Sequence, residues 1–493
     1  MNAFDGLITL IVFLPVLGAA VIAAFGRRES RVRLIALAAL AADLALAVYA
    51  WTVYANSGPI VEQLGAYGSD PWIPGINASY LLTIDGLSMP LVFLTALLGV
   101  VAVLASWHVR ERVREYHMWL LLLLTGVQGV FVAGDLLLFF LFWEVELVPM
   151  YFLIAMWGTG HREYSAMKFV LYTLFGSAFM LVGVLALRFA VGSFDMQVMM
   201  LEGQAGMIRP AFLTLEAISA LFLIAFAVKL PVWPLHTWLP DAHTDAPTAV
   251  SVLLAGVLLK MGGYGLIRIN VGMFPGETER WAPLLVALAV ISVLYGAAVV
   301  FRQTDLKRLV AYSSVSHMGL VLLGIASLGA VSVTGAALQM FAHGTITGLL
   351  FLVVGIVYEN AHTRHIPDLG GLIARMPVVG AVFILAGLAS LGLPLLSGFA
   401  AELMVFLGSF AVYPLATALA ALGIVLTAGY ILWTVERVLL GPLKARWRTI
   451  RDASAQDTVA MALLVVPIIA VGVYPALVSD VFRDGVTRLT GGG

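Results

Sequence analysis

The stretch from residue 223 to residue 243, LIAFAVKLPVWPLHTWLPDAH, decides the fold. Six apolar residues lead into Lys229, a proline-broken apolar stretch follows it, and no residue close by in the sequence neutralises its ammonium group. Because proline ends or kinks a helix, KLPVWP predicts a helix that is interrupted directly after the lysine. A charge at such an interruption needs a partner or a wet cavity from elsewhere in the chain.

The composition identifies the solvent around this chain. Hydrophobic residues make up 61% of the 493 residues, charged residues make up 11%, and the mean hydropathy is +1.01. A soluble domain carries about 25% charged residues. Because so few charges cannot cover a surface that faces water, the sequence predicts a polytopic membrane protein.

The composition and the absence of certain motifs exclude several functional classes. The chain has no cysteine, which rules out disulfides, thiolate-bound iron–sulfur clusters and Cys-ligated zinc. It has no glycine-rich nucleotide-binding motif, so we expect no cofactor in this chain. The net charge of −1 gives no reason to expect a nucleic-acid partner.

Apolar windows of about 20 residues, the length that crosses a hydrocarbon core of ~30 Å, recur along the whole chain. The fourteen predicted spans cover residues 6–25, 33–54, 83–107, 117–132, 135–157, 166–191, 212–240, 247–269, 281–301, 308–328, 332–358, 378–410, 415–440 and 457–480. Spans 212–240 and 378–410 are too long for one straight helix, and KLPVWP and GLPLLSG interrupt them. The N-terminal run lacks the basic segment of a signal peptide, so we expect it to be a retained first span.

Basic residues predict the orientation, because they concentrate in cytoplasmic connections. Most of the 27 lysines and arginines follow odd-numbered spans: Arg27, Arg28, Arg31, Arg33, Arg110, Arg112, Arg114, Arg162, Lys168, Arg302, Lys307, Arg308, Arg364, Arg375, Lys444, Arg446, Arg448 and Arg451. The even-numbered connections hold only Arg209 and Arg280. Both termini are therefore expected outside. The excess of arginine over lysine is typical of a bacterial gene rich in G+C, which indicates a bacterial inner membrane.

The two interrupted spans, the seventh and the twelfth, are five apart and so cross the membrane in opposite directions. Broken helices in corresponding positions suggest an inverted repeat. We expect an all-α membrane protein of about fourteen transmembrane helices with two five-helix inverted repeats. Its predicted parts are helices 1–3 (residues 1–116), the first repeat (117–270), the second repeat (281–440), and a cytoplasmic loop with helix 14 (441–493).

Ionisable groups within spans cost about 2.5–3.5 kcal/mol each, so each is a functional hypothesis. Lys229 and Lys260 lie too deep to snorkel easily; lysines paired only for packing remain the alternative. The other three lysines, 168, 307 and 444, lie at cytoplasmic span ends, where snorkelling explains them.

Four acidic residues also lie within predicted spans. Glu144 lies nine residues beyond Asp135, roughly 14 Å along the helix and near mid-bilayer. Glu146 lies about 200° further round, so one carboxylate could face the bundle and the other a neighbouring chain. Glu402 follows the second interruption. Asp43 is centred in the second span, where function and structural pairing are both open.

Histidines add a further set of polar groups. His317 and His343 lie within consecutive spans beside serine and threonine residues, which favours a hydrated path over two isolated core histidines. His236 and His243 lie in the connection HTWLPDAHTDAPT and are either loop polar groups or the mouth of a proton uptake route.

Three stretches carry a family resemblance: FWEVELVPMYFLIAMWG, AFAVKLPVWPLHTWLPDAHTDAPTAVSVLLAGVLLKMGGYGLIR and FRQTDLKRLVAYSSVSHMGL. Together they resemble the antiporter-like membrane subunits of respiratory complex I, the proton-pumping NADH:quinone oxidoreductase. Within that family the sequence is most similar to the M chains, the counterparts of mitochondrial subunit four. The M chains have a glutamate where Glu402 lies, whereas the L and N chains have lysine, and the L chains also have a long lateral helix.

The resemblance implies a set of roles. Glu144 is the acid of span five, Lys229 the base of span seven, Lys260 the bridging lysine of span eight and Glu402 the terminal acid. His317 matches the histidine of the connecting water path, and His343 matches it less closely. We refer to these six residues as the polar axis. Glu146 and Asp43 match nothing in the family pattern.

The expected function is proton translocation along the polar axis, driven by redox chemistry in partner subunits. Moving one charge against roughly 180 mV requires about 4 kcal/mol, and a buried Lys–Glu pair whose separation changes can supply that. The resemblance implies as partners L- and N-type chains, small membrane chains and lipids, with NADH and quinone handled by partner subunits. Alternatives are a subunit of a multi-subunit cation/proton antiporter or of a membrane hydrogenase, and a scaffold that moves no ion.

Overall fold

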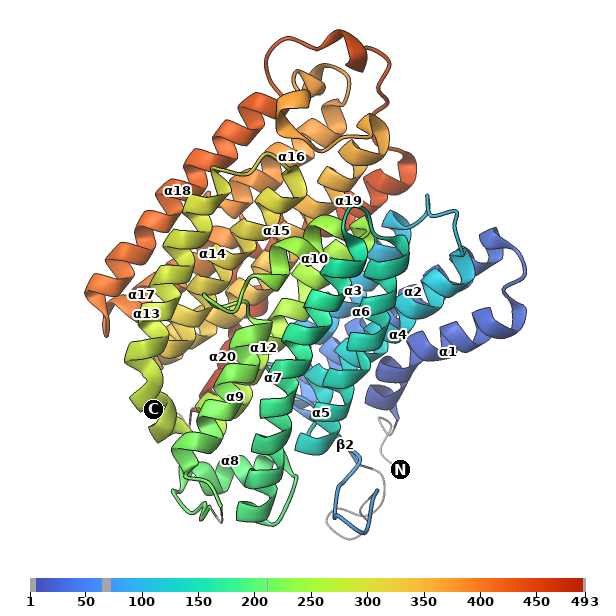
Figure 1. The fold of residues 1–493 in the computed structure, drawn as a ribbon. Coiled ribbons are helices and arrows are strands. Elements are labelled where there is room, and N and C mark those ends of the chain that lie inside the picture. The colour runs from blue at the N-terminus through green and yellow to red at the C-terminus, as the bar shows by residue number, and fades with distance from the viewer. Residues whose placement is uncertain (1–5, 64–71, 211, 491–493) are drawn as a thin grey trace.

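The computed structural model describes residues 6–63, 72–210 and 212–490, and its helices run side by side as one bundle (Figure 1). The helices are α1 (Leu7–Phe25), α2 (Glu29–Ser57), α3 (Met89–Ala105), α4 (Val113–Val132), α5 (Leu136–Val145), α6 (Leu147–Trp157), α7 (Arg162–Val191), α8 (Met196–Gln204), α9 (Leu215–Lys229), α10 (Trp238–Asp245), α11 (Thr248–Leu253), the π-helix η1 (Leu254–Leu258), α12 (Leu259–Gly265), the π-helix η2 (Leu266–Val271), α13 (Pro275–Val300), α14 (Leu306–Ala326), α15 (Ala330–Ala361), the short 3₁₀ turns η3 (Ile366–Asp368) and η4 (Leu372–Ala374), α16 (Pro377–Ser390), α17 (Ser397–Phe410), α18 (Pro414–Val438), the 3₁₀ turn η5 (Ala445–Trp447), α19 (Ala455–Val473) and α20 (Ala476–Leu489).

The helices confirm a polytopic membrane protein. Within the described ranges, 11 helical segments are long and apolar enough to cross a membrane. Three shorter apolar helices, α3, α16 and α17, lie in two further predicted spans. The total of fourteen spans stays a prediction.

The structure contains a short β-hairpin that the sequence did not predict. Strand β1 (Ile60–Gln63) pairs antiparallel with β2 (Leu81–Ile84), so the predicted span 83–107 begins in a strand. The carboxylate of Asp85 accepts hydrogen bonds from the backbone N–H groups of Leu87 and Ser88, which forms a turn before α3 can begin. Aspartate favours turns of this kind, because its side chain accepts hydrogen bonds from the backbone N–H groups two and three residues on.

Both predicted interruptions are present. Helix α9 ends at Lys229, and helical structure resumes at α10 only after Pro231 and Pro234. Helix α16 ends at Ser390, and α17 begins at Ser397. Between α16 and α17, Gly392 has a φ of 77°, a left-handed conformation that favours glycine.

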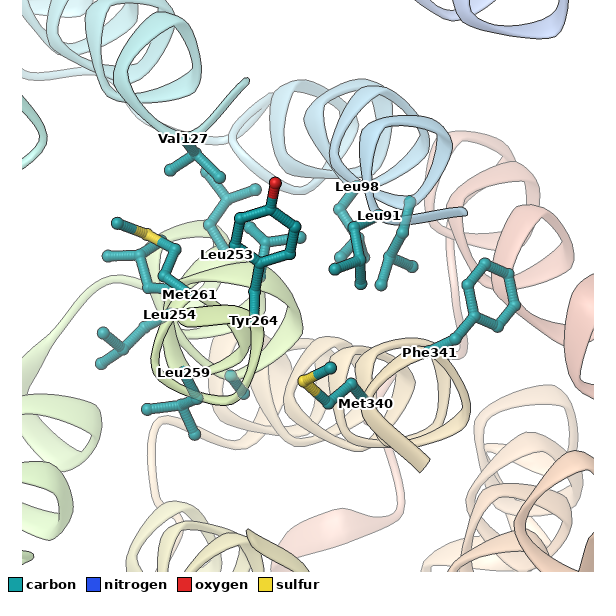
Figure 2. Close-up of a cluster of buried hydrophobic side chains, with 14 of the residues drawn as sticks. Leu91, Leu98, Val127, Leu253, Leu254, Leu259, Met261, Tyr264, Met340 and Phe341 are labelled. Atoms are coloured by element: carbon teal, nitrogen blue, oxygen red, sulfur yellow. The ribbon is translucent and has the colours of Figure 1, made fainter. Parts of the chain in front are cut away.

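The centre of the bundle is the segment from α11 to η2 together with the long helix α15. The apolar windows of both are 100% buried, whereas those of α2, α18 and α19 are 28%, 33% and 33% buried. Figure 2 shows the apolar packing at this centre: Leu91 and Leu98 of α3 and Met340 of α15 lie around Tyr264 of α12. Ionisable groups at the middle of these two elements, such as Lys260 and His343, are therefore desolvated.

The last predicted span, 457–480, ends earlier than expected. Helix α19 stops at Val473, and a separate amphipathic helix, α20, follows Pro475. Its buried residues recur at a spacing of three or four: Val478, Phe482, Val486 and Leu489. Its polar opposite face explains why hydropathy alone could not predict a second helix here.

Gly129 of α4 is a point of close helix contact, and replacing it with alanine is expected to destabilise the protein. A Cβ atom at Gly129 would lie 2.2 Å from the ring of Phe142 on α5. Overpacking of this kind costs about 1–3 kcal/mol. The measurement is the thermal unfolding of the detergent-solubilised protein. Gly276→Ala is the matched control, because a Cβ at that position meets no atom within 4 Å; equal unfolding temperatures for both variants would contradict the packing argument.

Candidate functional site

Lys229, the last residue of α9, is buried inside the bundle. Its side chain is 1% exposed, and its ammonium group forms an ion pair with Glu146, which is 0% exposed. The ammonium also lies 5.4 Å from the ring centroid of Trp143 and 5.5 Å from that of Phe169, where the negative ring faces attract a cation. Lys229 therefore has an acidic partner from a distant part of the chain, at the junction of α5 and α6.

The partner of Lys229 is a residue to which the family resemblance assigned no role. Glu146 lies at the junction of α5 and α6, where Pro149 has no N–H to bond the carbonyl group of Val145, but the backbone of Glu146 stays helical, with φ −73° and ψ −23°. The ion pair of Lys229 is therefore with Glu146 and not with Glu144. Glu144 lies on α5 in a partly exposed position beside Ser177 and within electrostatic range of Lys229. Pro149, three residues after Glu146, was the available signal in the sequence.

Lys260 lies on α12, at the centre of the bundle, and is 0% exposed. Its ammonium donates to the backbone carbonyl of Ala255, in the π-helix η1, and to Nδ1 of His343 at 2.7 Å. A π-helical turn frees carbonyl groups from the regular α-helical pattern, and such turns are frequent at functional sites. The local widening of this helix thus supplies an acceptor for a buried charge.

The two lysines lie on helices in direct contact. A Cβ atom at Gly262 of α12 would lie 2.7 Å from the backbone nitrogen of Leu230, the residue after Lys229. The glycine therefore allows the central helix to pack against the end of α9. Gly263, the next residue, faces Met340 of α15 in the same way. This segment thus bridges the broken helix on one side and α15 on the other.

His343, His317 and Glu402 continue from Lys260 in contact with one another. The ring centroids of His343 and His317 are 5.5 Å apart. Nε2 of His317 lies 3.1 Å from the hydroxyl of Ser390, and its Nδ1 lies 3.6 Å from Oε1 of Glu402. The structure therefore brings together four residues of the polar axis and gives His343 the linking place between Lys260 and His317.

A small cavity lies among these groups. Its volume is about 10 Å³, and His317, Gln339, His343 and Glu402 are among its lining residues. Nδ1 of His317, Oε1 of Gln339 and Nε2 of His343 have no hydrogen-bond partner among the described residues. A site of this size that is lined by several polar groups is at the threshold for holding one water molecule.

Three further residues, Lys307, His236 and His243, are more deeply buried than the sequence predicted. Lys307 is 2% exposed, and its ammonium donates to the carbonyl of Ala246 at 2.5 Å, so snorkelling does not explain it. His236, in the connection between α9 and α10, and His243, in α10, are 2% and 0% exposed. By contrast, Lys168 pairs with Asp241 at 2.7 Å, and Lys444 is exposed.

Asp43 lies apart from the polar axis. Its side chain on α2 is 1% exposed and accepts a hydrogen bond from the amide of Gln128 on α4 at 3.3 Å. The structure thus provides one neutral amide partner for Asp43, while its Oδ1 has no hydrogen-bond partner among the described residues.

Comparison with known proteins places this geometry in a family. Residues 133–427 match the family model described as NADH:quinone oxidoreductase/Mrp antiporter, transmembrane. The chain is 44% identical to NAD(P)H-quinone oxidoreductase chain 4 1 of Synechococcus elongatus, over 98% of this chain and 91% of the relative.

Solved structures agree with the sequence relatives. A chain of respiratory complex I from Thermus thermophilus is 29% identical and superposes with a TM-score of 0.87, covering 98% of this chain and 100% of that chain. A chain of the Mrp complex from Dietzia sp. superposes with a TM-score of 0.88 at 23% identity, covering 99% and 98%, which shows a shared fold alone. The chain belongs to the NADH:quinone oxidoreductase/Mrp antiporter family of membrane proteins.

Proposed function

We propose that this chain is a proton-translocating subunit in the membrane arm of an NADH:quinone oxidoreductase. The observation that carries the proposal is the buried sequence of contacts from Lys260 through His343 and His317 to Glu402. Ionisable groups at membrane depth are costly, and a line of them in contact is the arrangement that proton relays use. The 44% identity to a relative named NAD(P)H-quinone oxidoreductase chain 4 supports the choice of complex.

In this proposal protons reach Lys229 from the cytoplasmic side and pass to Lys260, His343, His317 and Glu402 in turn. An imidazole can accept a proton on one nitrogen and release another, so the two histidines suit the middle of the route. Ser390, within hydrogen-bond distance of His317, helps to orient its ring. Glu402 releases the proton to the outer side through the interruption between α16 and α17.

The chain itself carries out no redox step in this proposal. Partner subunits oxidise NADH and reduce quinone, and the resulting conformational change reaches the Lys229 ion pair. The poorly buried windows of α2, α18 and α19 provide flanks for L- and N-type chains, small membrane chains and lipids. The arginine-rich connection between α18 and α19 lies on the cytoplasmic side, with both termini outside.

The bundle divides, in the same proposal, into two functional halves. Residues 117–270 contain the Lys229 ion pair at the first broken helix, and residues 281–440 contain Glu402 just after the second. Residues 1–116 and 441–493 flank these halves. Each half thus places one ionisable group at a helix interruption, the location at which transporters of inverted-repeat architecture bind their ions.

Replacing Glu402 with glutamine tests the proposal. The amide fits the same space but cannot carry a proton, so we expect redox-driven proton uptake into vesicles to fall about tenfold or more, as for loss of a general acid or base. Glu436→Gln is the matched control, because Glu436 is exposed on α18 and should leave uptake unchanged. Wild-type uptake by an assembled Glu402→Gln complex would instead favour the scaffold that moves no ion.

A further inference from the structure

A second buried ion pair, which the proposed route does not use, lies on the same helical segment as Lys260. Arg268 of η2 donates two hydrogen bonds to the carboxylate of Asp85, at 2.5 and 2.7 Å, and the two side chains are 12% and 18% exposed. We propose that this pair is a proton barrier, which separates Lys260 from an outer cavity and so directs its proton on towards His343. The inference rests on the proposed function and assigns a role in it to residues outside the polar axis.

A cavity of about 600 Å³ lies on one side of the pair. Asp85 and Arg268 line it, together with residues of the β1–β2 hairpin, of α8 and of the C-terminal end of α20. The hairpin, α8 and α20 all belong to connections or chain ends that the distribution of basic residues predicts to be outside. In the proposed orientation, this cavity therefore faces the outer side, where protons accumulate when the complex pumps.

Lys260 lies on the other side of the pair. Lys260, Tyr264 and Arg268 follow one another at intervals of four residues, so they share one face of the helical segment. Arg268 is eight residues beyond Lys260, about 12 Å along the helix axis. Between them Tyr264 is 1% exposed and is surrounded by apolar side chains (Figure 2). A proton that crossed this short distance from the cavity would reach the middle of the polar axis and could return to the cytoplasm.

The hydrogen bonds of Tyr264 make the connection a barrier and not a proton wire. Its hydroxyl accepts from Nε of Arg268, at 3.2 Å, and donates to the backbone carbonyl of Phe131, at 3.1 Å. A carbonyl group has no proton to pass on, and a guanidinium does not release its proton in proteins. These bonds therefore relay no proton to Lys260, and the fixed positive charge of Arg268 repels a hydronium ion that enters from the cavity.

The pair is also held firmly, as a permanent barrier requires. Oδ1 of Asp85 accepts from the backbone N–H groups of Leu87 and Ser88, and Arg268 also donates to the hydroxyl of Ser88, at 3.1 Å. Bidentate pairs between charged groups are among the strong hydrogen bonds of proteins. Cζ of Arg268 lies 5.2 Å from the ring centroid of Tyr264, which adds a cation–π contact. Several partners thus fix the guanidinium in one position.

The test is the passive leak of protons across vesicles that contain the whole complex and receive no redox substrate. Asp85→Asn with Arg268→Gln removes both charges together, so that neither is left buried alone, and frees space that water can enter. The lumen of inverted vesicles, which corresponds to the outer side, is acidified, and valinomycin with potassium prevents a membrane potential. We expect protons to leave the lumen about fivefold faster than in wild type, or more, once the electrostatic barrier is removed.

A matched control makes the same two substitutions in an exposed ion pair. Asp480 and Arg483 of α20 are 56% and 60% exposed, and Asp480→Asn with Arg483→Gln should leave the leak at the wild-type rate. Assembly of every complex is checked on a native gel. A wild-type leak in the assembled Asp85→Asn, Arg268→Gln complex would overturn the inference.

Adding Lys260→Met distinguishes a barrier in front of Lys260 from a general loosening of the packing. If the pair blocks a path to the lysine, the triple variant should leak at the wild-type rate, because the path then ends at a side chain that carries no proton. A raised leak that persists in the triple variant would overturn the inference. Should the double variant fail to assemble, Arg268→Lys provides the test, since lysine keeps the charge but can release its proton. A leak above wild type is then expected, and a wild-type leak would contradict the barrier.

Redox-driven proton uptake by the same preparations separates this inference from the proposed function. The leak is measured without redox chemistry, so the two results are independent. If the leak is unchanged while Glu402→Gln still stops pumping, the barrier is wrong and the proposed function stands. If the Glu402→Gln complex pumps normally, the proposed function itself is wrong.

Discussion

Replacing Lys229 with methionine is expected to abolish redox-driven proton uptake by the chain's complex. Methionine has a similar length but cannot carry a proton, so the route loses the group that alternates between charged and neutral forms. The measurement is proton uptake into vesicles alongside electron transfer from NADH to quinone. In a tightly coupled complex both rates should fall together, because the redox reaction cannot proceed when its proton step is blocked.

The control must separate catalysis from folding, because Lys229→Met leaves the carboxylate of Glu146 buried without its cation. Breaking a buried pair in this way costs about 3–5 kcal/mol. The double variant with Glu146→Gln removes that unpaired charge and should recover assembly without recovering pumping. Lys444→Met changes an exposed lysine and should behave as wild type. If both rates persist in Lys229→Met, the lysine is structural and the mechanism is wrong at its centre.

Replacing Lys260 with methionine is expected to have an effect of similar size. Lys260 provides the contact with His343, at 2.7 Å, through which the first half of the polar axis reaches the second. Without the ammonium, protons at Lys229 have no path to His317, so redox-driven acidification of vesicles should fall to background. Quenching of a pH-sensitive dye in vesicles measures this. Lys168→Met is the matched control, because Lys168 pairs with Asp241 away from the polar axis.

Arginine at position 260 distinguishes proton transfer from a fixed charge. The guanidinium keeps the positive charge but does not release its proton in proteins. Lys260→Arg should therefore fail to pump even when the complex assembles. Normal pumping by this variant would show that Lys260 serves as a permanent charge, and the route would have to pass elsewhere.

Much of the fold was predictable because each transmembrane helix is specified locally. Apolar length predicts a span, and proline with glycine predicts an interruption; both interruptions occur where KLPVWP and GLPLLSG lie. The missed elements are those without such signals. The hairpin of β1 and β2 depends on pairing between strands, and α20 depends on an amphipathic face that packs against α15.

The candidate site, like the fold, was predictable only in part. The identities of Lys229, Lys260, His317, His343 and Glu402 follow from the cost of placing an ionisable group in an apolar span. Their contacts do not, because they come from different helices. Rotation about the helix axis gives Glu144 and Glu146 different faces, but it does not say which face meets Lys229.

The sequence by itself determined that this chain lies in a membrane, that two of its helices are interrupted at KLPVWP and GLPLLSG, and that Lys229 and Lys260 are buried, because all three depend on the transfer of local segments out of water. Only the tertiary structure decided that Lys229 pairs with Glu146, that His343 links Lys260 to His317, and that Lys307 is enclosed. Each of these depends on how whole helices pack, since a rotation of one helix by a single residue, about 100°, exchanges the side chain that meets its partner.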